Sequence, residues 1–115
     1  MSSTRRDPPL AQWPLAARLE RVHIDHLELP ADEEGYVGAV IIVDAATGVA
    51  ELVPVKSLRA KPIADAVEHE WIARYGPPRT LVTDNAQAMR GRVMERMLAR
   101  HGIDAATHRL RVVGD

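Results

Sequence analysis

The sequence predicts an α/β protein with a mixed five-stranded sheet and flanking helices. Three observations predict this class: β-branched apolar runs fill the first half, two helical stripes follow, and a short β-like segment comes after each stripe. A helix between two strands usually returns the chain to a parallel neighbour, whereas a short turn joins antiparallel strands. The sheet should therefore combine an antiparallel meander with parallel crossovers.

The first half contains three candidate strands. Residues 21–29 form the first, and residues 37–43 form a nearly continuous β-branched run that suits a strand buried on both faces. After a short Gly-containing turn, residues 49–55 return as a third strand. Pro54 predicts an edge position for this strand because proline cannot donate a hydrogen bond to a neighbour.

The second half alternates helices and strands. Apolar residues recur at three- and four-residue spacing over residues 60–75, which predicts one helix, and residues 80–83 follow as a short strand. A second helix is expected over residues 89–100 and a last strand over residues 103–107. The expected core face of the second helix consists of Val93, Met94, Met97 and Leu98.

Composition limits the possible classes. With 115 residues, 46% hydrophobic and 27% charged, the chain suits one globular domain, which we place at residues 19–115 after a flexible tail at residues 1–18. The absence of cysteine excludes disulfides, thiolate catalysis and Cys/His zinc modules. No apolar stretch reaches membrane-spanning length and the start does not resemble a signal peptide, so we expect a soluble protein without a membrane partner.

Charge is distributed unevenly along the chain. Residues 1–55 hold four Arg/Lys and nine Asp/Glu, a balance of −5, whereas residues 56–111 hold eleven and six, a balance of +5. Arg92, Arg96 and Arg100 recur at four-residue spacing on one side of the second helix. This row is either a solvated helix face or a contact for DNA phosphates.

Two aspartates occur in or beside β-like runs. Asp25 lies within the first strand, and Asp84 ends the strand at residues 80–83 and precedes Asn85. Carboxylates on adjacent strands repel each other, and a divalent cation relieves that repulsion. The alternatives are that Asp25 is a surface or ion-paired residue and that Asp84 caps the turn formed with Asn85.

Other polar residues have simpler interpretations. Asp44 is expected to shape the hairpin between the second and third strands. His23 and His26 point to opposite faces of a strand, so a shared zinc site is not expected.

Several motifs occur in an order typical of a known family. The set resembles the catalytic core of integrases from retroviruses and long-terminal-repeat retrotransposons, which has a ribonuclease H-like fold. The resemblance covers roughly residues 21–109. The motifs that carry it are Val22-His23-Ile24-Asp25, Val37 to Asp44, Glu51 to Pro54, Glu70-Trp71-Ile72-Ala73-Arg74-Tyr75-Gly76-Pro77-Pro78, Thr83-Asp84-Asn85 and His101-Gly102-Ile103.

The resemblance implies DNA integration by metal-dependent strand transfer. Asp25 and Asp84 match two of the three carboxylates with which the family holds two Mg²⁺ (or Mn²⁺) ions, and they are the expected catalytic and metal-binding residues. DNA is the expected partner, in a homo-oligomer located in the nucleus or cytoplasm. The residues expected to contact nucleic acid are Asn85, Arg92, Arg96 and Arg100.

The family's third carboxylate, a glutamate on a later helix, has no match in this chain. We therefore expect a truncated core that lacks the C-terminal helices and exposes apolar sheet surface. The alternative is a non-catalytic transposon remnant that acts as a nucleic-acid-binding or assembly module. A ribonuclease H-like nuclease is a third possibility that the aspartates alone leave open.

Overall fold

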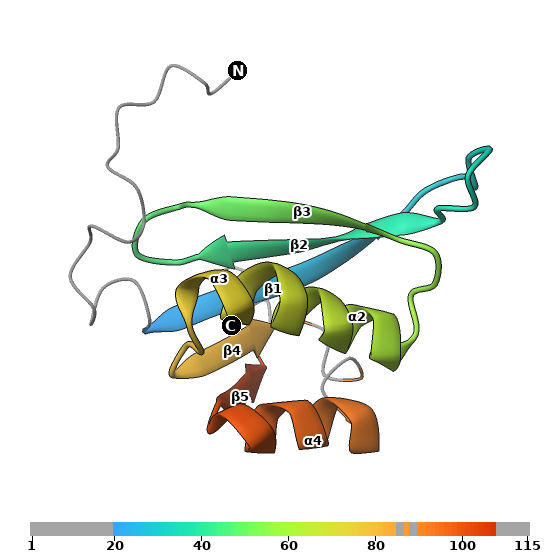
Figure 1. The fold of residues 1–115 in the computed structure, drawn as a ribbon. Coiled ribbons are helices and arrows are strands. Elements are labelled where there is room, and N and C mark those ends of the chain that lie inside the picture. Colours follow the sequence, from blue (N-terminus) through green and yellow to red (C-terminus); the bar gives the residue numbers. More distant parts are fainter. Residues whose placement is uncertain (1–19, 85–86, 88–89, 108–115) are drawn as a thin grey trace, which may run out of the picture.

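A computed structural model of the protein describes residues 20–84, 87 and 90–107. Two predictions concern residues outside these ranges: the flexible tail at residues 1–18 and the nucleic-acid contact of Asn85. Figure 1 shows the elements in chain order. They are β1 (Arg21–Glu28), β2 (Gly38–Asp44), β3 (Ala50–Val55), α2 (Ala60–Val67), the π-helical segment η3 (Glu68–Ile72), α3 (Ala73–Tyr75), β4 (Thr80–Thr83), α4 (Arg92–His101) and β5 (Asp104–Thr107).

The strands form one sheet in the order β3-β2-β1-β4-β5. Strands β1, β2 and β3 pair as an antiparallel meander, while β4 lies parallel to β1 and β5 lies parallel to β4. The predicted mixed five-stranded sheet is confirmed, including the parallel crossover that leads to β4. Strand β3 lies at an edge, which agrees with the position of Pro54.

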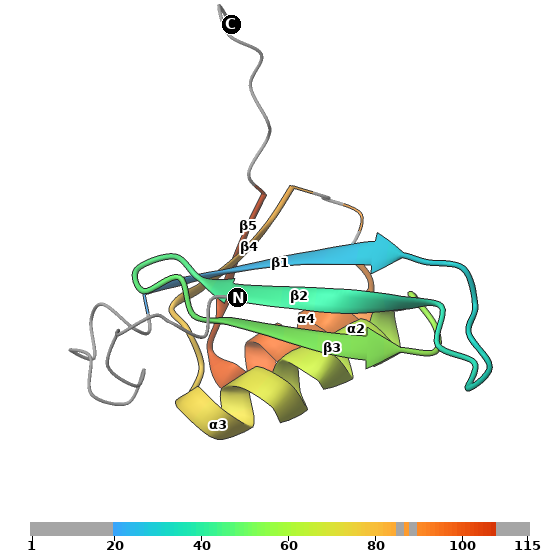
Figure 2. The same ribbon diagram turned by 90° about the horizontal axis from the view of Figure 1, so that it is seen from above.

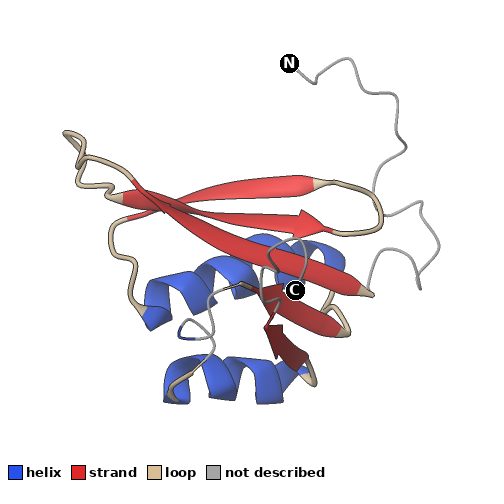
Figure 3. Ribbon diagram, turned by 180° about the vertical axis from the view of Figure 1, so that it is seen from behind, coloured by secondary structure: helices blue, strands red, loops and turns tan. Residues whose placement is uncertain are grey.

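All described helices lie on one face of the sheet, and Figure 2 looks towards the other face across β1, β2 and β3. Figure 3 shows the same two layers from behind, with α2 and α4 below the strands. Core residues from strands and helices meet between the layers. They include Val22, Ile24, Val40, Ile42, Val67, Trp71, Leu81, Met94 and Met97.

The second strand is less covered than expected. Val40 and Ile42 point to the helices and are buried, but Ile41 and Val43 point the other way and are only half-buried. The expectation that this strand is buried on both faces was therefore wrong. No described helix packs over its second face, which we call the open face (Figure 2).

The predicted helix over residues 60–75 contains a π-helical segment at its centre. In η3 the backbone turn widens, so the stripe of apolar residues shifts sideways while Trp71 and Ile72 stay buried. Glu68, at the start of this segment, contacts α4. Tyr75, after it, contacts β3. A regular three- and four-residue spacing does not reveal such a shift.

Helix α4 begins at Arg92 and ends before Gly102, whose φ of 66° suits glycine. Met94, Met97 and Leu98 are buried as expected. Val93 is 39% exposed, so its assignment to the core was wrong. At 100° per residue, Val93 lies beside the arginine row and not beside Met94.

Candidate functional site

The first candidate aspartate lies on the open face. Along β1, Val22 and Ile24 point into the core, so His23 and Asp25 point away from the helices. Asp25 is exposed, and its Oδ1 accepts a hydrogen bond of 2.8 Å from the backbone N–H of His26. Because the side chain is exposed, a ligand can reach this carboxylate.

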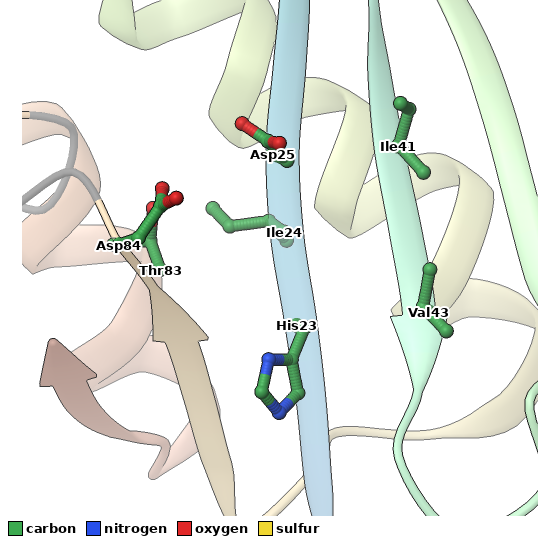
Figure 4. Close-up of a pocket in the computed structure, with 7 residues that line it drawn as sticks. All are labelled: His23, Ile24, Asp25, Ile41, Val43, Thr83 and Asp84. Carbon is green, nitrogen blue, oxygen red and sulfur yellow. The ribbon is translucent and has the colours of Figure 1, made fainter. Parts of the chain in front are cut away.

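The second candidate lies directly after β4. The parallel ladder between β1 and β4 aligns Val22 with Leu81 and His23 with Val82. Two further residues along the same register bring Asp25 level with Asp84. Both residues line one pocket, and Figure 4 shows their carboxylates at the gap between the two strands. The structure thus brings the two predicted residues together.

The pocket has a volume of about 210 Å³ and two chemically different ends. Asp25 and Asp84 form its acidic end, whereas His23 lies farther along β1 beside the apolar floor (Figure 4). The residues that line it are His23, Ile24, Asp25, Ile41, Val43, Thr83 and Asp84. Carboxylate oxygens are hard ligands of the kind that Mg²⁺ prefers, and Mg²⁺ commonly takes one or two carboxylates while keeping several waters.

The described residues supply only part of a protein metal cage. They contain no group of three or more His, Asp or Glu side chains that could hold a metal ion. Within the same residues, neither Asp25 nor Asp84 forms an ion pair with a cationic side chain. The donor set therefore fits a cation that is held by two carboxylates, with other ligands from solvent or substrate.

The predicted arginine row lies away from this pocket. Arg92 and Arg96 are exposed on α4, in the helix layer on the opposite side of the sheet from Asp25. Arg100 is already engaged, because its Nε and Nη2 donate to Glu68 Oε2 at 3.0 and 2.8 Å. Within the row, Arg92 and Arg96 are thus the residues with side chains available to a phosphate.

Glu68 was not singled out from the sequence. Its Oε2 also lies 2.7 Å from His101 Nε2, so one carboxylate joins η3 to the end of α4. The contact with His101 and the Arg100 guanidinium hold the pKa of Glu68 below its ordinary value of 4.5. Glu68 is 32 residues from Arg100 and 33 from His101, so no local pattern in the sequence predicts these contacts.

Two simpler predictions are confirmed. Asp44 shapes the β2–β3 hairpin, because its Oδ2 accepts hydrogen bonds of 2.8 Å from both the backbone N–H and the hydroxyl of Thr47. His23 and His26 occupy alternate positions of β1 and so point to opposite faces.

Two curated proteins are similar to this chain in sequence. The chain is 31% identical over 107 residues to the uncharacterised protein K02A2.6 of Caenorhabditis elegans, covering 92% of this chain and 8% of that protein. It is 31% identical over 85 residues to the Gag-Pol polyprotein of feline leukemia virus, covering 74% of this chain and 5% of the polyprotein. The chain thus spans less than a tenth of these relatives. No protein-family model matches the sequence.

Solved structures share the fold. The HTLV-2 integrase catalytic core domain in complex with magnesium superposes with a TM-score of 0.68 at 18% identity in its dimeric form, over 78% of this chain and 61% of that chain. Its trimeric form gives a TM-score of 0.67 at 19% identity, over 78% and 60%. A chain of the simian T-cell lymphotropic virus intasome in complex with PP2A regulatory subunit B56 gamma gives 0.68 at 19% identity, over 78% and 32%.

Fold and sequence together define the class of the protein. The mixed sheet with its flanking helices is the ribonuclease H-like fold of integrase catalytic cores. In sequence the chain is similar to part of a retroviral Gag-Pol polyprotein, and in fold it matches retroviral integrase catalytic cores. In the described part of the chain, no helix is long and apolar enough to cross a membrane.

Proposed function

We propose that this domain takes part in DNA integration by metal-dependent strand transfer and that Asp25 and Asp84 are its metal-binding and catalytic residues. One observation carries the proposal: in an integrase-core fold, Asp25 on β1 and Asp84 directly after the adjacent parallel strand β4 line the same pocket. Magnesium in the HTLV-2 cores supports the choice of Mg²⁺ or Mn²⁺ as the cofactor.

The residues of the pocket have separate tasks in this proposal. A bound Mg²⁺ or Mn²⁺ supplies positive charge that activates an attacking oxygen and stabilises a leaving oxygen at phosphorus. Asp25 and Asp84 would hold this cation. The amide of His26 fixes Asp25 Oδ1, which limits the rotation of this carboxylate before a cation arrives.

The DNA partner is proposed on chemical grounds. Arg92 and Arg96 are exposed cations on the helix layer and suit phosphate contacts, while Asn85 directly follows the metal ligand Asp84 in sequence. Arg100 would contact DNA only by breaking its hydrogen bonds to Glu68.

We place the protein in the nucleus or cytoplasm as a homo-oligomer. The intasome and the dimeric and trimeric integrase cores support this choice of partners.

A second candidate function follows from the incomplete donor set. The described residues provide two carboxylates but no cluster of three metal-ligating side chains. A non-catalytic nucleic-acid-binding or assembly module needs only the fold and the basic helix. This alternative and the enzyme differ in whether the pocket binds a divalent cation and whether DNA strands are joined.

Metal binding tests the first proposal directly. Mn²⁺ is titrated into ¹⁵N-labelled protein, and paramagnetic broadening of backbone resonances is followed for the parent chain and for Asp25→Asn and Asp84→Asn. We expect broadening to centre on residues that line the pocket and the affinity to fall about tenfold or more in each variant. Asp104→Asn, which changes an exposed carboxylate on β5, is the matched control.

The same proteins are then assayed for strand transfer with DNA-end mimics. Metal-dependent joining that both substitutions abolish would support the enzyme. Equal Mn²⁺ affinity in all four proteins would refute the metal site. Binding of duplex DNA without Mn²⁺ binding in the pocket and without any joining would favour the non-catalytic module.

A further inference from the structure

The solvent-facing side of α4 combines cationic and apolar side chains. On a helical wheel, Arg92, Arg96 and Val93 fall within about 100° of one another. Val93 is 39% exposed although it is apolar. Among the residues that the structure describes, Arg92 and Arg96 form no ion pair, whereas Arg100 on the same side is held by Glu68. We call Arg92, Val93 and Arg96 the basic α4 face.

A surface with negative instead of positive charges lies at the β1–β2 connection. This connection projects beyond the end of the sheet, well away from α4 (Figures 1 and 3). Leu29 is 50% exposed there, and Glu33 and Glu34 are exposed. The loop has a defined shape, because Asp32 Oδ1 accepts hydrogen bonds of 2.9 Å from the backbone N–H groups of Glu34 and Tyr36. We call Leu29, Glu33 and Glu34 the acidic tip.

We propose that the basic α4 face of one copy of this domain binds the acidic tip of a second copy. Within the described part of one copy, the charged residues of both surfaces form no ion pair, and each surface combines one exposed apolar residue with two charges of one sign. Docking would place Leu29 against Val93 and the two glutamates against the two arginines. The inference does not depend on metal binding at Asp25 and Asp84, but it gives Arg92 and Arg96 a partner that would compete with DNA phosphates for them.

The uneven charge distribution supports the choice of a second copy as the occupant. The acidic tip belongs to the half with a balance of −5 and the α4 face to the half with a balance of +5. Because the two surfaces are different and well separated, their contact is heterologous, and a pair of copies retains one free surface of each kind. Association therefore extends into chains or closes into a ring, and it does not stop at a two-fold dimer.

The strength of the contact depends on ionic strength. Exposed ion pairs contribute little individually and are screened by salt, so the association is weak and is strongest at low salt. At about 1 M salt, where the Debye length is roughly 3 Å, only the apolar contact between Leu29 and Val93 contributes. Sedimentation velocity over a range of concentrations should therefore show mass increasing at low salt and a monomer at high salt.

Charge reversal provides the decisive test. One variant carries Glu33→Arg with Glu34→Arg, a second carries Arg92→Glu with Arg96→Glu, and a third carries all four substitutions. The third keeps the formal net charge of −1, because four units of positive change offset four of negative change. We expect each double variant to be monomeric at low salt and the fourfold variant to associate like the parent chain. Circular dichroism confirms that each variant is folded.

Each outcome of this experiment decides the proposal. Parent-like association of either double variant, or a fourfold variant that stays monomeric although folded, would overturn it. A parent chain that is monomeric at low salt and high concentration would overturn it as well. If a reversed variant does not fold, the neutral pair Glu33→Gln with Glu34→Gln replaces it, and a several-fold weaker association is then the supporting result.

Discussion

Aspartate side chains have opposite environments on the two faces of the sheet. Asp44 ends β2 on the helix-covered face, where it is fully buried and Thr47 donates two hydrogen bonds to it. Asp25 lies on the neighbouring strand but on the open face, where it is exposed and accepts one backbone hydrogen bond. A carboxylate in a β-branched run therefore stabilises the fold when it lies on the helix-covered face. It is available to a ligand when it lies on the open face.

The covered face also tolerates polar groups that are not fully paired. Within the described residues, Asp44 Oδ1 and Trp71 Nε1 are buried without a hydrogen-bond partner. Each such group costs roughly 1–3 kcal/mol. Burial of large side chains such as Leu81 and Met97 offsets these costs. Among the described residues, no helix covers the open face, so Asp25 and Asp84 are exposed there and can exchange water for a cation.

Removing the buried carboxylate should have the largest effect on stability. Asp44→Ala is expected to lower the free energy of unfolding by about 2 kcal/mol, because it leaves the buried backbone N–H and hydroxyl of Thr47 without this acceptor. Urea denaturation followed by circular dichroism measures the change. A loss below about 0.5 kcal/mol would show that the hairpin does not depend on this carboxylate.

A double-mutant cycle with Thr47→Val separates the interaction from general damage. If the two residues stabilise the hairpin through each other, the double variant should lose less stability than the sum of the two single variants. Additive losses would instead mean that each side chain acts through other neighbours.

Periodicity was sufficient to predict most of the fold. Alternation places Asp25 and Ile24 on opposite faces of β1, and the edge position of β3 follows from Pro54, so both could be read from the sequence. These are local properties of the backbone. The pairing of Asp25 with Asp84 was predicted by resemblance, and the parallel register between β1 and β4 supplies its geometric basis.

Features that depend on packing between distant segments could not be predicted. The π-helical turn in η3 and the contact of Glu68 with α4 arise only when the two helices meet on the sheet. Val93 was assigned to the core because it is apolar. Its burial depends instead on its angular position around the helix axis, which differs from that of Met94. The openness of one sheet face is likewise a property of the assembled layers.

A smaller effect is expected at the contact between η3 and α4. Glu68→Gln should lower the free energy of unfolding by about 1 kcal/mol near neutral pH, since it weakens the charge-assisted bonds to Arg100 and His101. The folded pKa of Glu68 lies below 4.5, so its stabilisation is fully present above pH 4.5 and is lost as pH falls through the folded pKa.

The difference in stability between the parent chain and Glu68→Gln should accordingly shrink below pH 4.5. Denaturation measured from pH 3 to 7 tests this dependence. Lys61→Met, which removes an exposed pair with Asp65, is the control and should show little change at any pH. A constant difference across the range would mean that Glu68 acts through packing instead of charge.

The smallest effect on the isolated protein is expected at the open face. Asp25→Asn and Asp84→Asn should each change the free energy of unfolding by less than about 0.5 kcal/mol in chelator, because the side chains are exposed and replacing one relieves their mutual repulsion. With Mg²⁺ at ten times its dissociation constant, the parent chain should gain about 1.4 kcal/mol, whereas the variants should gain much less. If Mg²⁺ stabilised all three proteins equally, the cation would bind at another site. The two faces of the sheet would then differ in how deeply their carboxylates are buried but not in metal binding.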